Sequence, residues 1–208
     1  MIARMPSVAG AVEPTFRMFR INYIQLNKAL EYYQSPKSHH LWFDPDPTQF
    51  HSFYIIEEVI RLLHNYAASA MTLVTHTTNE ARKLDHLEQL ANFRNEYKEE
   101  INRRFAQNEN HQLIQGLRNY MLHYSLVEGS NHWEWHREKG EKRTIGIQTE
   151  PLLKWKGWKP LAKQKIARAG KHIIIHDVVN QYFADIDSFH KWLWDWQGRM
   201  INSRILPI

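Results

Sequence analysis

The sequence predicts an all-α fold, an antiparallel helical bundle with a small β-hairpin insertion. Apolar residues recur at helical spacing over long stretches, Gly and Pro are few (eight of each), and one short stretch alternates as strands do. With 208 residues, of which 43% are hydrophobic and 12% aromatic, the chain can bury the core of one good-sized domain.

Several classes of protein are excluded by what the sequence lacks. It has no Cys, and therefore no disulfide, thiolate zinc site, iron–sulfur cluster or cysteine nucleophile. It has no Walker-type loop, GxGxxG or GxSxG element to support nucleotide hydrolysis or α/β-hydrolase chemistry. No stretch near the start is apolar enough for a secretory signal, and no run approaches the ~20 apolar residues that span a bilayer. We expect a soluble cytoplasmic protein with no cofactor and no membrane partner.

The N-terminal region shows the weakest pattern. Residues 16–33 are expected to form a helix, followed by a loop rich in Pro and His through 44–47. We interpret residues 1–45 as a partly helical N-terminal extension and 46–208 as a single bundle domain.

Three helices are expected to follow in that domain. Apolar residues step by four and three over 48–75, and Asp-Pro-Thr at 46–48 offers a cap and a first-turn proline. The stretch 79–107 has apolar residues on one side and charged residues or Asn on the others. Residues 108–124 form a shorter helix with a single apolar face.

The helical pattern stops after this short helix and resumes later. Alternating residues around Lys139-Gly140-Glu141 predict a hairpin over about 128–150. Residues 151–168 are expected to be helical, with Pro160 as the point where a break would fall. A long helix over 172–200 carries an apolar stripe that suits a bundle seam or an oligomer contact equally well: Ile175, Val179, Tyr182, Ile186, Phe189, Leu193, Trp196 and Met200.

The short helix carries a polar motif, Arg118-Asn119 followed by His123. Asn119 and His123 are four residues apart and share a face of the helix. Arg118 and His123 are separated by about 140° around the axis and roughly 7.5 Å along it, so one helix does not hold them tightly together. They would meet near a helix end, or across a two-fold interface to which each subunit contributes both.

This motif, late in a helical bundle, resembles the Arg-polar-x-x-x-His pattern of nucleases of the HEPN superfamily. The matching residues are Arg118, Asn119 and His123, and the resemblance covers roughly residues 48–200. It implies a HEPN-type bundle that forms a homodimer and acts as a metal-independent endoribonuclease. It also suggests a toxin or defence effector, with a cognate antitoxin or other protein as partner. Some HEPN-like domains are non-catalytic.

The residue types suit the chemistry that this resemblance implies. A neutral His123 can accept the proton of a ribose 2′-hydroxyl, and the alkoxide then attacks the adjacent phosphate. Arg118 would stabilise the negative charge of the transition state, and Asn119 would orient His123 or bind phosphate. The products would be a 2′,3′-cyclic phosphate and a 5′-hydroxyl.

A basic stretch suggests where RNA would bind. Residues 133–171 contain eleven Lys or Arg and four acidic residues, a net charge of +7 that exceeds the +5 of the whole chain. Trp residues interleave with these charges and could stack on bases, although Trp155 and Trp158 suit the core better. We expect RNA contacts from the hairpin, at Lys139, Lys142, Arg143, Trp133 and Trp135.

Other readings stay open. His172 and His176 have a spacing that can ligate zinc, but no third ligand is evident, so we expect no metal site. The chain could instead be a non-catalytic RNA-binding or protein-interaction module that uses the same hairpin. A third alternative is a structural subunit that assembles through the apolar stripe of its C-terminal helix.

Overall fold

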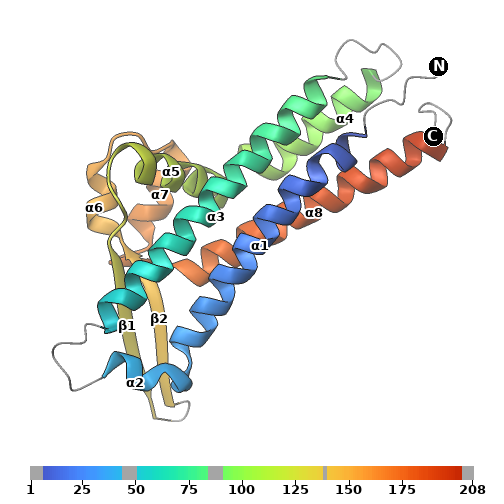
Figure 1. The fold of residues 1–208 in the computed structure, drawn as a ribbon. Coiled ribbons are helices and arrows are strands. Elements are labelled where there is room, and N and C mark those ends of the chain that lie inside the picture. Colours follow the sequence, from blue (N-terminus) through green and yellow to red (C-terminus); the bar gives the residue numbers. More distant parts are fainter. Residues whose placement is uncertain (1–6, 44–50, 84–90, 138–139, 203–208) are drawn as a thin grey trace.

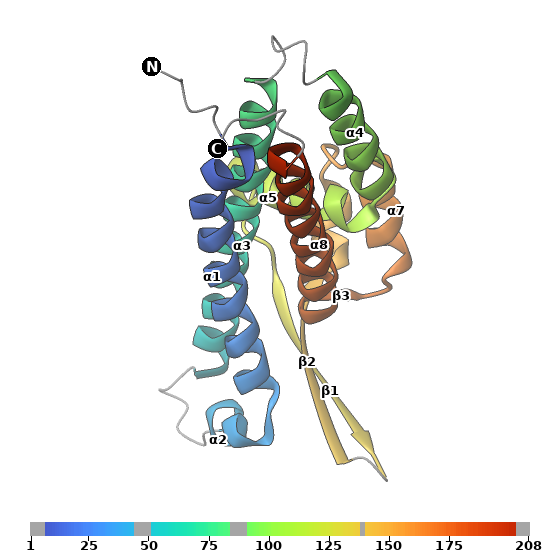
Figure 2. The same cartoon turned by 90° about the vertical axis from the view of Figure 1, so that its right-hand side faces the viewer.

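Three long helices form the body of the protein in a computed structural model, which describes residues 7–43, 51–83, 91–137 and 140–202. They are α1 (Val8–Gln34), α3 (His51–Arg82) and α8 (Ile175–Asn202). Helix α1 runs antiparallel to the other two and packs against both (Figures 1 and 2). A 3₁₀ turn (Pro36–Ser38) and the short α2 (His39–Trp42) follow α1 at the lower end of the bundle.

The remaining elements lie along the flanks of this bundle. They are α4 (Ala91–Ile101), a π-helical stretch (Asn102–Ala106), α5 (Glu109–His123), β1 (Gly129–His136), β2 (Gly140–Gln148), α6 (Thr149–Lys154), α7 (Pro160–Arg168) and β3 (His172–Ile174). The fold is thus mainly helical with a small antiparallel sheet, as the sequence predicts. None of the described helices has both the length and the hydropathy that a membrane span requires.

Helix α1 belongs to the core, so the interpretation of residues 1–45 as an extension is wrong for residues 8–34. Phe19 of α1 is fully buried, with its ring centroid 5.1 Å from that of Tyr66 on α3 and 6.3 Å from that of Tyr182 on α8. The Tyr66 hydroxyl donates to the carbonyl oxygen of Val179 at 3.1 Å. The expected helix over 16–33 starts earlier, at Val8, because the Ser7 side chain caps it by accepting from the Gly10 amide at 2.8 Å.

The apolar stripe of the C-terminal helix packs inside its own subunit. Every member whose side chain the structure describes is at most 7% exposed: Ile175, Val179, Tyr182, Ile186, Phe189, Leu193 and Trp196. The stripe is therefore a bundle seam, and the alternative of an oligomer contact through it is wrong.

The sheet is larger than the expected hairpin. Strands β1 and β2 pair from Gly129 opposite Ile147 to His136 opposite Gly140, which confirms the hairpin. The third strand, His172–Ile174, pairs with the end of β2, although the sequence pattern assigns these residues to the last helix. Three consecutive Ile at 173–175 favour extended backbone, and Gly170 makes the preceding turn with φ 73°.

Two other helix boundaries differ from expectation. Helix α3 continues to Arg82 and α4 begins at Ala91, so no single helix spans 79–107; residues 84–90 lie outside the described residues.

Two expectations about the shorter helices agree with the structure. The stretch after the hairpin is interrupted, since α6 ends at Lys154 and Pro160 occupies the first turn of α7. The short helix expected over 108–124 is confirmed as α5.

Candidate functional site

Helix α5 carries the Arg-Asn-x-x-x-His motif and is held firmly along its length. Its Asn108 cap accepts from the His111 amide at 2.9 Å, and Leu113, Ile114 and Leu117 are completely buried. At Gly116 the ring of Trp158 lies against the helix so closely that a Cβ there would be 2.4 Å from a ring carbon. The indole of Trp158 in turn donates to the carbonyl oxygen of Leu152 at 2.7 Å, which fixes α5 against α6 and α7.

Arg118 and Asn119 line a groove between α5 and α3. Both are half-buried, and Nη1 of Arg118 donates to Oδ1 of Asn119 at 3.1 Å. The groove has a volume of about 390 Å³, and α3 contributes Thr72, Thr75 and His76 to its wall. Oε1 of Gln115, another lining residue, is buried and accepts no hydrogen bond from any described residue. The groove therefore offers a guanidinium with two amide side chains close by.

His123 lies at the end of α5 and is exposed, but it is not among the residues that line this groove. The structure thus brings Arg118 and Asn119 together and leaves His123 one helical turn beyond Asn119, as the helical spacing predicts. Three exposed apolar side chains lie next to it along the chain: Leu122, Tyr124 and Leu126 are 44%, 57% and 63% exposed.

Arg143 is not available to RNA, so its prediction as an RNA contact is wrong. Its side chain is 0% exposed, with Nη2 donating to Oε1 of Glu141 at 2.6 Å. The guanidinium carbon lies 4.8 Å from the ring centroid of Trp133 and 5.1 Å from that of Trp42. Position 143 shares its face of β2 with the buried Ile145 and Ile147, and this period-two pattern is the signal that places it inside.

The other hairpin predictions have mixed outcomes. Lys142 is exposed and Trp135 is 77% exposed, so both are accessible. Trp133 is 43% exposed but packs on Arg143 and on Phe43, whose ring centroid is 4.2 Å away. Lys139 lies outside the described residues.

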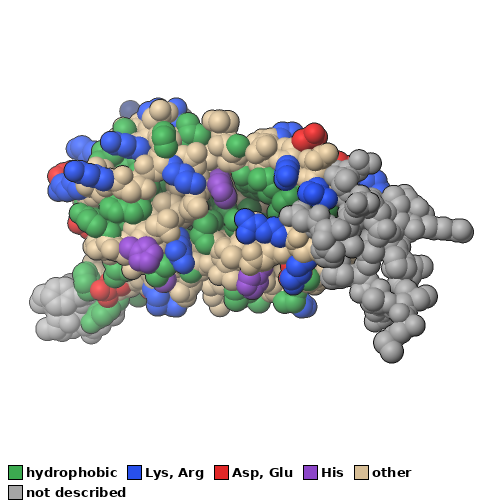
Figure 3. Space-filling model, turned by 90° about the horizontal axis from the view of Figure 1, so that it is seen from above, with side chains coloured by type: hydrophobic (Ala, Val, Ile, Leu, Met, Phe, Trp, Pro, Cys, Tyr) green, Lys and Arg blue, Asp and Glu red, His purple; other side chains and the backbone are tan. Residues whose placement is uncertain are grey.

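A surface that the hairpin prediction missed carries unpaired positive charge. Lys156, Lys159, Lys163 and Lys171, on α7 and the loops that flank it, are exposed and have no ion-pair partner among the described residues. By contrast, Lys165 pairs with Glu109 at 2.8 Å, Arg168 pairs with the same carboxylate, and Lys154 pairs with Glu150 at 3.2 Å. Seen from above, Lys and Arg side chains gather at the end of the molecule where α6 and α7 lie (Figure 3). We call the four lysines the α7 lysine surface.

His172 and His176, whose spacing can ligate zinc, do not form a metal site with other described residues. His172 stacks on His132 of β1 with ring centroids 3.2 Å apart, and His176 interacts with Asn180 instead, at 3.1 Å. Burial, reinforced by the neighbouring His172, lowers the pKa of His132. No group of three or more His, Asp or Glu within the described ranges could hold a metal ion. Only the fold of the sheet, which sequence spacing did not predict, brings His132 and His172 together.

Comparison of the chain with protein-family models, with curated proteins and with solved structures gives no match. The motif on α5 therefore stands on its own geometry and on the resemblance that its residues carry.

Proposed function

We propose that this chain is a metal-independent endoribonuclease of the HEPN type that cleaves RNA through its own 2′-hydroxyl. One observation carries the proposal: all three motif residues are accessible at one end of α5, with Arg118 and Asn119 in a groove and His123 exposed beside it. Enclosure of either ionisable group in the core would have kept it away from RNA. A role as a toxin or defence effector with a cognate antitoxin belongs to the same proposal.

In the proposed reaction His123 is the general base. As a neutral imidazole it takes the proton of the 2′-hydroxyl, and the resulting alkoxide attacks the adjacent phosphorus. The bond to the 5′-oxygen breaks, which leaves a 2′,3′-cyclic phosphate and a 5′-hydroxyl. The guanidinium of Arg118 stabilises the charge on the phosphate oxygens, and Asn119 holds the guanidinium through the 3.1 Å hydrogen bond. DNA is spared because it lacks the attacking hydroxyl.

The proposed active form is a homodimer. Within one subunit His123 lies outside the groove that holds Arg118, so a complete site needs a second copy of the motif beside the first. The exposed Leu122, Tyr124 and Leu126 next to His123 give this end of α5 an apolar surface that a second subunit would cover. A second His123 would then serve as the general acid for the leaving 5′-oxygen.

The α7 lysine surface is the part of the molecule we propose to bind the RNA backbone, in place of the hairpin. It adjoins the motif helix, since Tyr120 of α5 contacts the rings of Trp155 and Trp158, at 5.6 and 5.9 Å between centroids. A lysine without an ion-pair partner can neutralise a phosphate without losing another interaction. A lysine that is already paired with a carboxylate must give up that ion pair, so it contributes less binding free energy.

The decisive experiment incubates single-stranded RNA with the protein in EDTA and maps the ends of the products. We expect cleavage with cyclic phosphate ends, and a fall of roughly 100- to 10,000-fold in His123→Ala because a general base is removed. His40→Ala, which removes another exposed histidine on α2, is the matched control and should retain full activity. Undiminished cleavage by His123→Ala, or products with 3′-hydroxyl ends, would refute the proposal.

The second candidate is a non-catalytic RNA-binding module, favoured by the α7 lysine surface and by the absence of His123 from the described residues that line the groove. Such a module binds RNA without cutting it, with an affinity that falls as salt rises. Changing Lys156, Lys163 and Lys171 together to Glu should release RNA in either case. The same change at three exposed residues of the other flank, Arg20, Lys28 and Lys37, should leave most of the affinity intact.

A further inference from the structure

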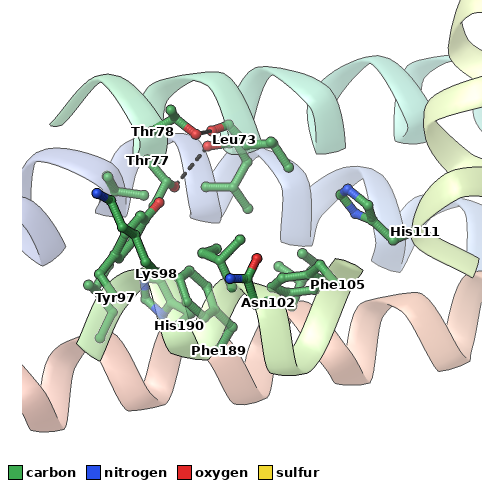
Figure 4. Close-up of a pocket in the computed structure, with 15 residues that line it drawn as sticks. Leu73, Thr77, Thr78, Tyr97, Lys98, Asn102, Phe105, His111, Phe189 and His190 are labelled. Carbon is green, nitrogen blue, oxygen red and sulfur yellow. Dashed lines mark hydrogen bonds between the residues drawn. The ribbon is translucent and has the colours of Figure 1, made fainter. Parts of the chain in front are cut away.

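An apolar cavity of about 440 Å³ lies between α3, α4 with its π-helical stretch, and α8 (Figure 4). It is distinct from the motif groove, because Val74 alone among the described residues lines both. The cavity is partly open to solvent, and most of its wall is apolar. The volume falls within the range of sites that hold small organic ligands.

The π-helical stretch Asn102–Ala106 contributes to one wall of the cavity. Asn102 and Phe105, both from this stretch, line it together with Phe189 of α8 and Leu73 of α3. A π-helical turn adds a residue to the helix and displaces its side chains, an arrangement found frequently at functional sites. An irregular helical turn is therefore part of the cavity wall.

The inside of the cavity carries little charge. Burial, followed by the positive charge of Lys159, lowers the pKa of His111 to about 4, so its imidazole is neutral at physiological pH. Burial raises the pKa of Tyr97, which keeps its hydroxyl protonated. Thr77 and Thr78 donate to the carbonyl oxygens of Leu73 and Val74, each at 2.8 Å. These polar groups are therefore neutral, and the hydroxyls of the two threonines are already engaged. His190 also lines the cavity; its Nε2 lies 3.3 Å from Oε2 of Glu13, and burial lowers its pKa.

The cavity has one charged end. Figure 4 shows Lys98 at the same end as Tyr97, Thr77 and Thr78, while His111 lies at the other end with Leu73, Phe105 and Phe189 between them. Lys98 is exposed, and no carboxylate of the described residues pairs with it. An elongated apolar space with a single ammonium at one end matches a ligand that is long, apolar and singly negative.

We propose that this cavity binds an unbranched aliphatic monocarboxylate of medium chain length. Its carboxylate lies against Lys98 and its chain extends between Leu73 and Phe189 towards His111. The ammonium gives the head group an ion pair at the solvent boundary, and the chain leaves water for apolar walls. The site goes beyond the ribonuclease proposal and stands or falls independently of it.

Calorimetric titration with decanoate, well below its micelle concentration, tests the chain and the head group separately. We expect decanoate to bind, octanoate to bind about tenfold more weakly because two methylenes fewer are buried, and decanol to bind more weakly than decanoate at low salt. Equal affinity for octanoate and decanoate would overturn the assignment of the cavity to the chain. Equal affinity for decanol and decanoate would overturn the assignment of the head group to Lys98.

Two variants locate the site. Lys98→Met changes only an exposed side chain and should remove the preference for decanoate over decanol. The control Lys28→Met, at an exposed lysine on α1, should preserve that preference.

The second variant, Leu73→Trp, fills the cavity and should abolish binding of both ligands. Because that variant tests a buried position, its thermal unfolding is compared with the wild type, and only a folded variant is titrated. Decanoate should also raise the unfolding temperature of the wild type and not that of folded Leu73→Trp. Binding that survives in folded Leu73→Trp would refute the proposal.

Discussion

The two ends of helix α5 differ sharply although one helix forms both. At the N-terminal end, Asn108 caps the helix, Glu109 pairs with Lys165 and Arg168, and the ring of His111 lies 5.2 Å from that of Phe105. At the C-terminal end, His123 is exposed. Each end has a histidine, but His123 is exposed, whereas His111 is half-buried and lines the apolar cavity.

This difference teaches how a helix can support a reactive group. The N-terminal end is fixed by its cap, its ion pairs and Trp158, so the position of the last turn is set without burying the residues in it. Residues that act on a substrate need an orientation held by a rigid scaffold and a side chain open to solvent. We therefore expect substitutions at the C-terminal end to change activity and substitutions at the N-terminal end to change stability.

Beyond the His123→Ala variant described above, the largest expected effect is at Arg118. Arg118→Ala should lower RNA cleavage about 100- to 1,000-fold, because the charge that stabilises the transition state is lost, and should change the free energy of unfolding by less than about 1 kcal/mol. Cleavage rates and urea unfolding measure the two quantities. Arg118→Lys keeps the charge but not the planar fork, so it should recover part of the activity. A large loss of stability in Arg118→Ala would place this residue in the scaffold instead.

The second-largest expected effect is a loss of stability at acidic pH, which we attribute to His111. The folded chain holds the pKa of His111 at about 4, below the ordinary value of 6.5, so the unfolded chain binds a proton more readily. Stability is fully present above pH 6.5 and falls as the pH drops from 6.5 to 4, by about 3 kcal/mol at most from this group. Urea unfolding across this range should show the loss, and it should be smaller in His111→Gln. An equal loss in both proteins would show that His111 does not cause it.

The smallest expected effect is at the helix cap. Asn108→Ala removes the acceptor for the His111 amide and the 2.8 Å hydrogen bond from Nδ2 to Asp185, so it should cost about 1–2 kcal/mol of unfolding free energy. Asn108→Ser keeps a capping oxygen and should recover much of the loss. The rate of RNA cleavage should be unchanged in both variants under conditions where they are folded. A fall in cleavage by folded Asn108→Ala would mean that the two ends of α5 are coupled.

The sequence predicts those parts of the fold that depend on long repeating patterns. The stripe of α8, the length of α5 and the hairpin follow directly from spacings of three and four residues or of two. The place of residues 8–34 in the core was missed because partners such as Tyr66 and Tyr182 lie far away in sequence. Strand β3 was missed because three residues are too few to show a period, and its pairing with β2 depends on the fold.

The candidate site, too, could be predicted from the sequence only in part. Helical geometry alone predicts that Asn119 and His123 share a face of α5 and that Arg118 lies apart from His123, since one element holds all three. The net charge of the basic stretch gave the wrong RNA contact at Arg143, because charge says nothing about which face of a strand is buried. Likewise, sequence cannot separate Lys165, which Glu109 neutralises, from Lys163, which has no ion-pair partner among the described residues.

The close contact between Gly116 and Trp158 constrains how such a chain can evolve. A methyl group at 116 would overlap the indole, so a change there must be accompanied by a smaller residue at 158. The two positions are thus expected to diverge as a pair.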